Sequence, residues 1–253
     1  MGREMVPLDS AWVIAYLVVM VAALSKGVTG FAFNLVSTPI LLLVLEPRAV
    51  IAVNLVLASL LSVFVVVQSP RQVNIRRVLS LTAASALGVP LGIYLLLLMS
   101  APTLKLVMGL VVVLSAIPMF LGYSRSFRRE GLASGLFGFV SGVLGSSTSL
   151  SGPPIVLFLV NQGWDKESFR ASISAYFFLT NMVALASLTA SGAINLDMIS
   201  AALALIPACL IGFYLGVKLL PRVNASIFNR MSVIIVMATG VFATFLEVIK
   251  LYR

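Results

Sequence analysis

Long apolar stretches separated by short polar segments run along the whole chain. Stretches of about twenty apolar residues match the hydrocarbon core of a bilayer. The longest lie at residues 11–26, 49–67, 77–99, 103–123, 131–145, 168–190, 196–220 and 226–249, and shorter apolar pieces lie at 35–45 and 153–161. The long stretches are uniformly apolar and do not alternate, which favours helices over a membrane β-barrel. The pattern therefore predicts an all-α integral membrane protein.

Composition supports this prediction and extends it. Hydrophobic residues make up 60% of the chain and charged residues 10%, and the mean hydropathy is +1.12. A soluble domain usually carries about 25% charged residues, so lipid must solvate much of this surface. The formal charge of +9 does not indicate nucleic acid, because basic residues between membrane spans normally set topology. We expect a multi-pass protein of the cytoplasmic membrane whose macromolecular environment is the lipid bilayer, and the sequence is compatible with a homo-oligomer.

The chain contains an internal repeat. Residues 27–42, "GVTGFAFNLVSTPILL", align with residues 142–157, "GVLGSSTSLSGPPIVL", at an offset of 115 that matches glycines and prolines. Weaker matches follow later in each half, and the most specific joins "GVPLG" at 88–92 to "GFYLG" at 212–216. We therefore predict two repeats, each made of a broken pair of half-helices followed by three full spans, with boundaries at 1–123 for the first repeat, 124–130 for a cytoplasmic joint and 131–253 for the second.

Each predicted repeat crosses the membrane an odd number of times, so the second repeat must be inverted relative to the first. Basic residues favour cytoplasmic loops, and they gather in the segments 71–77, 125–129, 166–170 and 218–230. An inverted repeat places these four segments on one side, which is then the cytoplasm. Both termini are therefore predicted to lie outside.

Prolines mark the breaks. Proline suits the first turn of a helix, so Pro39 and the pair 153–154 are interpreted as helix starts, with Ser37-Thr38 and Ser151-Gly152 as N-caps. The short helices that follow are expected to end near Leu45 and Val160, too short to cross a membrane. Matching breaks in inverted halves indicate a transporter binding site, and helix N-termini inside it favour an anion.

The candidate substrate-binding residues lie in and beside these breaks. A lysine deep in a membrane is costly and by default functional, although Lys26 would snorkel to the surface if its helix crosses fully. Glycine and serine are also common where membrane helices simply pack, and Asn54, Tyr176 and Asn181 are interpreted as contacts between helices. The candidates are Lys26, Asn34, Ser37, Thr38, Ser146, Ser147, Thr148, Ser149, Ser151 and Gly152.

The two motifs, "KGVTGFAFNLVSTPILL" and "SGVLGSSTSLSGPPIVL", together with "LGVPLGIYL" and "IGFYLGVKL" late in each half, resemble the TauE/SafE family, the sulfite exporter family of membrane permeases. The resemblance covers about residues 11–249. It implies an integral-membrane transporter of sulfur-bearing anions such as sulfite or organosulfonates. The residues themselves indicate an anion, and sulfur comes from the resemblance alone.

Other functions remain open. An anion channel would use the same features, and serine-lysine chemistry at Lys26 is conceivable for an intramembrane enzyme. Acid-base or metal catalysis is disfavoured, because the chain has no histidine, its carboxylates fall in loops, termini or segment ends, and Cys209 is the single cysteine. We therefore expect no cofactor, no metal and no enzyme activity. The absence of an intramembrane acid also favours export assisted by the membrane potential over proton coupling.

Overall fold

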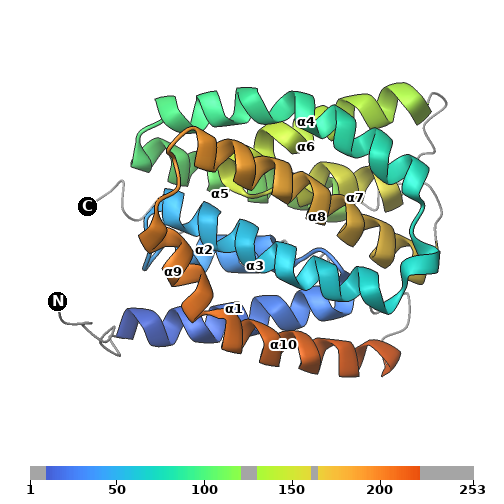
Figure 1. The fold of residues 1–253 in the computed structure, drawn as a ribbon, viewed down its shortest axis with the longest axis horizontal. Coiled ribbons are helices and arrows are strands. Elements are labelled where there is room, and N and C mark those ends of the chain that lie inside the picture. Colours follow the sequence, from blue (N-terminus) through green and yellow to red (C-terminus); the bar gives the residue numbers. More distant parts are fainter. Residues whose placement is uncertain (1–9, 121–129, 161–164, 223–253) are drawn as a thin grey trace.

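The computed structural model describes residues 10–120, 130–160 and 165–222 of the 253-residue chain. Within these ranges every regular element is a helix (Figure 1). The elements are α1 (Ser10–Thr29), α2 (Phe33–Leu41), α3 (Pro47–Gln68), the 3₁₀ turn η1 (Pro70–Gln72), α4 (Ile75–Leu98), α5 (Ala101–Phe120), α6 (Glu130–Thr148), α7 (Gly152–Val160), α8 (Lys166–Ala190), α9 (Leu196–Ala204), α10 (Ile206–Leu219) and the 3₁₀ turn η2 (Leu220–Arg222). The predicted all-α class is confirmed for these residues, and the predicted span at 226–249 lies outside them.

Four of the described helices are long and apolar enough to cross a membrane. They are α1, α3, α4 and α8, and α9 with α10 meets the same test as a bent pair. Large apolar side chains such as Leu87 and Leu136 are exposed on the outside of the bundle. Exposed apolar surface on this scale is what a lipid-facing protein requires, so the structure has the character of a multi-pass membrane protein.

The predicted single span at 196–220 is broken. Helices α9 and α10 meet at 45° around Leu205, and Pro207 occupies the second position of α10. Proline has no N–H to bond the preceding turn and its ring clashes with the carbonyl four residues back. The helix therefore bends where the proline begins the second segment.

Polar side chains cap the N-termini of α4, α8 and α9, which each follow a loop. The side chains of Asn74, Asp165 and Asn195 each accept a hydrogen bond from the backbone N–H three residues later, at 3.2, 2.9 and 3.0 Å respectively. Such caps satisfy N–H groups that the helix itself leaves free. The bond from the Ser168 N–H also holds the pKa of the Asp165 carboxyl below its usual value. The capping residues therefore fix where α4, α8 and α9 leave their loops.

Helices that the sequence alignment pairs run in opposite directions. In Figure 1, α1, α3 and α10 run from left to right, whereas α4, α6 and α8 run from right to left. The basic segments meet at the right-hand end: Lys166 Nζ donates to the Leu220 carbonyl oxygen at 3.1 Å, and Asn74 N–H donates to Ser172 Oγ at 2.9 Å. These bonds place the described parts of segments 71–77, 166–170 and 218–222 side by side, while the basic joint at 125–129 lies outside the described residues.

Glycines let the first helix of each half approach a helix of the other half closely. Helix α1 packs along α10, and α6 packs along α4 (Figure 1). A Cβ at Gly27 would lie 2.7 Å from the Phe213 carbonyl oxygen, and one at Gly142 would overlap the backbone of Ser85. Small residues allow backbone contact of this kind between membrane helices. The two predicted halves therefore interlock, with α3 and α8 packed against each other between these pairs.

Candidate functional site

The two breaks meet near the centre of the bundle. Asn34 Nδ2, in the first turn of α2, donates to the Ser149 carbonyl oxygen in the α6–α7 break at 2.6 Å. Asn34 and Ser149 occupy equivalent positions at the repeat offset of 115. Asn54 Nδ2 on α3 lies 3.2 Å from Ser149 Oγ and also donates to Thr38 Oγ1 at 2.9 Å. A buried hydrogen-bond network thus joins one break to the other.

The first break lies earlier than the sequence pattern predicts. Helix α2 begins at Phe33 and ends at Leu41, so Ser37, Thr38 and Pro39 lie inside it, and the prediction of Pro39 as the helix start and of Leu45 as the helix end is wrong. The turn is made instead by Gly30, whose φ is +84°, and by Thr29 Oγ1, which accepts from the N–H groups of residues 31 and 32 at 3.3 and 3.1 Å. The threonine satisfies the free N–H groups, and the glycine adopts the left-handed turn without strain.

The second break lies where the prolines place it. Helix α7 begins at Gly152, which confirms the predicted start to within one residue, and it is helical up to Val160, the last described residue before 165. Ser149 has a φ of +63°, which is unusual for a residue with a side chain and is held by its bonds to α2 and α3. At the repeat offset, the break at 149–151 corresponds to 34–36, four residues beyond the break at 30–32. Aligned segments of the two halves are therefore broken about one helical turn apart.

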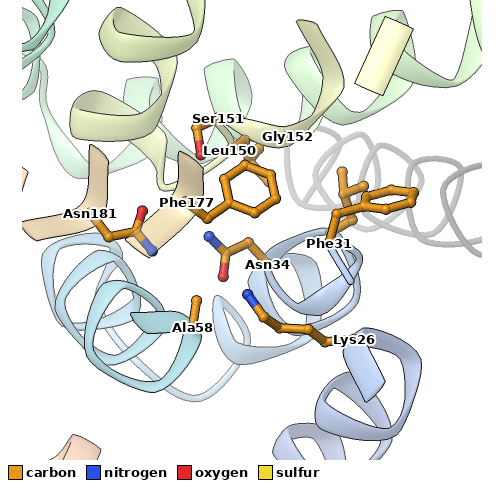
Figure 2. A pocket seen from close by; sticks show the side chains of 10 residues that line it. Lys26, Phe31, Asn34, Ala58, Leu150, Ser151, Gly152, Phe177 and Asn181 are labelled. Carbon is orange, nitrogen blue, oxygen red and sulfur yellow. The ribbon is translucent and has the colours of Figure 1, made fainter. Parts of the chain in front are cut away.

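A small pocket lies between the two breaks (Figure 2). Its lining comes from the end of α1, the first turn of α2, the middle of α3 and α8, the start of α7 and the two breaks themselves. The lining residues are Lys26, Phe31, Asn34, Leu35, Ala58, Leu150, Ser151, Gly152, Phe177 and Asn181. The side chains approach so closely that the free space holds about one water molecule, so the pocket is closed in this conformation.

Lys26 is buried in this pocket and does not snorkel. Its side chain is 1% exposed, its Nζ donates to Ser62 Oγ at 2.8 Å, and the Nζ lies 5.4 Å from the centroid of the Phe177 ring. The carboxylates whose side chains the structure describes are all exposed at the surface or partly so: Glu46, Asp165, Glu167 and Asp197. A buried ammonium that lacks a carboxylate partner is costly, and an anion beside it would lower that cost.

Two polar atoms at the pocket have no hydrogen-bond partner among the described residues. They are Asn34 Oδ1 and Asn181 Nδ2, and both are inaccessible to solvent. Buried polar atoms are normally paired, so each unpaired atom here is available to a ligand. The sequence pattern assigns Asn181 to helix contacts, and only its polarity within an apolar span could have marked it as a site residue.

The remaining candidates divide into two groups. Ser37, Thr38 and Ser149 belong to the network around Asn54, in which Ser37 Oγ donates to Asn54 Oδ1 at 2.8 Å. The other group is Ser146, Ser147 and Thr148. Their hydroxyl groups donate to the carbonyl oxygens four residues earlier in α6, at 2.8, 2.7 and 2.6 Å. Of the predicted residues, the pocket brings together Lys26, Asn34, Ser151 and Gly152.

Arg170 is buried, although the sequence pattern presents its charge only as a topology signal. It is 5% exposed, its Nη2 donates to the Gly27 carbonyl oxygen at 2.9 Å, and both terminal nitrogens reach Gln68 Oε1 at 3.3 and 3.4 Å. A cation is stabilised at the C-terminal end of a helix, and Gly27 lies in the last turn of α1. Arg170 therefore fixes the end of α1 against α8 and α3. The residue that it bonds, Gly27, directly follows Lys26 in the chain.

The apolar wall of the pocket could not be predicted. Phe31, Leu35, Ala58, Leu150 and Phe177 resemble any other apolar residue of a membrane helix, so no sequence signal separates them from packing residues. Among the described residues, no group of three or more His, Cys, Asp or Glu side chains gathers that would hold a metal ion. The described pocket therefore combines the Lys26 ammonium with amide and hydroxyl groups and with helix starts, and the Arg170 guanidinium lies beside the first break.

The comparisons with known proteins identify the family of the chain. No curated protein and no solved structure gives a significant match. The sequence profile of the family described as "Sulfite exporter TauE/SafE" matches residues 15–243, nearly the whole chain. A match of this extent includes both breaks and every residue of the pocket. The chain therefore belongs to the TauE/SafE sulfite exporter family of membrane transporters.

Proposed function

We propose that this protein is a secondary transporter that moves a small sulfur-containing anion, sulfite or an organosulfonate, out of the cell across the cytoplasmic membrane. The observation that carries the proposal is the buried Lys26 ammonium at a closed pocket between two broken helices. Membership of the sulfite exporter family supports the class of substrate.

The geometry favours an anion for two reasons. The first is the charge of Lys26, whose ammonium contacts a serine hydroxyl and an aromatic ring. The second is the position of the helix starts: Gly152 begins α7 and lines the pocket, and Asn34 and Leu35 line it from the first turn of α2. Helix N-termini carry a partial positive charge, and among the first three residues of α7 only Gly152 has an N–H group, because residues 153 and 154 are prolines. Together these groups form a site that stabilises negative charge.

Alternating access between two inverted repeats is the mechanism we propose. Three observations support it: aligned helices run in opposite directions, the first helix of each half packs on the other half, and the breaks touch at equivalent residues. In such transporters one repeat rocks against the other around a fixed site. The pocket is too small in this conformation for sulfite, so binding requires an opening motion.

The charges support outward transport and cytoplasmic basic loops. With the basic end of the bundle in the cytoplasm, both termini lie outside. An inside-negative potential drives each negative charge outward with about 2.3 kcal/mol per 100 mV. No carboxylate with a described side chain is buried where a proton relay would need it. Export of an anion needs no such relay, because the potential supplies the driving force.

A thermal-shift panel on the purified protein tests the proposed substrate. Ligands that bind only the folded state raise the unfolding temperature in proportion to the logarithm of their concentration once the site is saturated. We expect sulfite or a small sulfonate to stabilise the protein selectively, and chloride and nitrate at equal ionic strength serve as controls. No stabilisation by any sulfur anion would contradict the proposal. An anion channel is the alternative, and unitary currents in planar bilayers would establish it over a carrier.

A further inference from the structure

Asn34 holds a hydrogen-bond acceptor toward the pocket, although the rest of the site favours an anion. Its Nδ2 donates to the Ser149 carbonyl oxygen at 2.6 Å, and its Oδ1 is buried without a partner in the part of the chain that the structure describes. Turning the amide over would set Oδ1 against the carbonyl oxygen of Ser149, two acceptors in contact. The network therefore fixes the orientation, and the oxygen faces the pocket.

The neighbouring ammonium is engaged elsewhere. Lys26 Nζ donates to Ser62 Oγ at 2.8 Å, and Ser62 Oγ in turn donates to the Ala58 carbonyl oxygen at 2.8 Å, which fixes this serine on α3. Figure 2 shows the Asn34 oxygen and the Lys26 nitrogen on the same side of the pocket, and the Asn34 oxygen accepts no bond from the lysine. A ligand between them meets a positive donor and a neutral acceptor at once.

Asn181 provides the complementary group. Its side chain is 2% exposed, it lines the pocket, and its Nδ2 has no partner among residues 10–120, 130–160 and 165–222. Unlike Asn34, no bond fixes its amide in the described structure, so it can rotate to offer its N–H to an anion. Lys26 and Asn181 are then the donors to the negative oxygens of the anion. The Asn34 oxygen stays unpaired unless the anion itself carries a hydrogen-bond donor.

We propose that Asn34 makes the site selective for anions that carry a hydrogen-bond donor. Hydrogen sulfite or a hydroxysulfonate satisfies Lys26 and Asn34 together. Sulfate, thiosulfate or an unsubstituted sulfonate leaves Asn34 Oδ1 facing an anionic oxygen or an apolar carbon. An unsatisfied buried acceptor is strongly disfavoured, and sites built to bond a substrate hydroxyl reject analogues that lack it. This inference rests on the proposed anion site and specifies its substrate.

Calorimetric titration of the full-length protein with matched sulfonates tests the inference at one pH, since sulfonates stay ionised throughout. The pairs are ethanesulfonate with 2-hydroxyethanesulfonate, and methanesulfonate with hydroxymethanesulfonate. We expect the hydroxyl to tighten binding by about tenfold or more in at least one pair. In Asn34→Leu the gain should fall below about twofold, whereas Asn181→Leu should weaken both members of a pair and keep their ratio.

The outcomes separate this inference from the proposed function. Binding of sulfonates with no hydroxyl preference in either pair overturns the selectivity and leaves the anion site standing. A preference that persists in Asn34→Leu shows that another group reads the hydroxyl and also overturns it. If no sulfur anion binds at all, sulfite included, the proposed function fails and this inference fails with it. A wild-type protein that shows no hydroxyl preference overturns the inference even if a variant does not fold.

Discussion

At the scale of single residues, the positions that matter most are the charge of Lys26 and the turn at Gly30. Lys26 could be predicted as a site residue because a lysine at the end of a long apolar run is costly in lipid and is usually kept for a function. Its contacts with Ser62 and Phe177 could not be predicted, because they depend on how α1, α3 and α8 are rotated against one another. Gly30 was visible as a repeated glycine, but its partner Arg170 comes from the other half of the chain.

Lys26→Gln should weaken sulfite binding by at least about tenfold, since it removes the charge that attracts the anion. The empty protein should be as stable as the wild type or more stable, because a buried unpaired charge is lost. Lys26→Arg should restore binding poorly, because its planar fork presents donors in another geometry. Titration calorimetry and thermal unfolding measure both effects, with Lys218→Gln, on the surface of α10, as the control. Wild-type affinity in Lys26→Gln would mean that the breaks hold the anion without the lysine.

Gly30→Ala should destabilise the protein by about 2–4 kcal/mol, the sum of left-handed backbone strain and a steric clash. An added Cβ would lie 2.8 Å from Arg170 Cγ. Gly192 is the matched control: its φ is +70°, but no atom lies within 4 Å of the added Cβ. Gly192→Ala should therefore cost only the strain, about 1 kcal/mol. Equal losses in denaturant unfolding would show that the contact with Arg170 contributes nothing.

At the scale of elements, local chemistry decided which predictions succeeded. The start of α7 could be predicted because two prolines follow its first residue and leave the helix no other place to begin. The start of α2 could not, since Thr29 and Gly30 complete the turn before Pro39 is reached. Hydropathy does not reveal the bend between α9 and α10, because the apolar stretch continues without interruption through Pro207. Apolar pattern finds spans, whereas capping and proline position decide where they break.

Gly142→Ala should separate α6 from α4 and destabilise the protein by about 1–3 kcal/mol, because the new Cβ overlaps the backbone of Ser85, which cannot move aside. Gly135→Ala, on the same helix, has no atom within 4 Å and should be neutral or slightly stabilising, since alanine favours helix. Thermal unfolding of the two variants in the same detergent makes the comparison. Loss of stability in Gly135→Ala alone would contradict this packing of α6 on α4.

At the scale of the whole molecule, the sequence predicts a repeat and its inversion, but it does not predict the pocket. Glycine and proline matches at one offset predict that the chain has two halves. Which side chains face the pocket depends on how five helices pack against one another. The identity of an apolar residue such as Phe177 does not indicate whether it will line the pocket. The interlocking of α1 with α10 and of α4 with α6 likewise becomes visible only in three dimensions.

The topology predicts that the two ends of the bundle lie on opposite sides of the membrane. Gln72 and Ser191 are exposed, the first in η1 and the second at the end of α8. In a Cys209→Ala background, Gln72→Cys should react with an impermeant maleimide only in inside-out vesicles, and Ser191→Cys only in intact cells. Labelling of both from the same side would contradict the arrangement of the halves. Ser126, in the basic joint, offers an independent position outside the described residues.

The central claim, that the closed pocket carries a sulfur anion across the membrane, is tested most directly by sulfite flux into proteoliposomes under a clamped potential. The wild type should move labelled sulfite, faster when the potential drives the anion in the direction measured, by up to about tenfold for each 60 mV on one transferred charge. Lys26→Gln, reconstituted at equal density, should transport at less than about a tenth of that rate. Flux no greater than in empty liposomes, or equal flux in Lys26→Gln, would contradict the account.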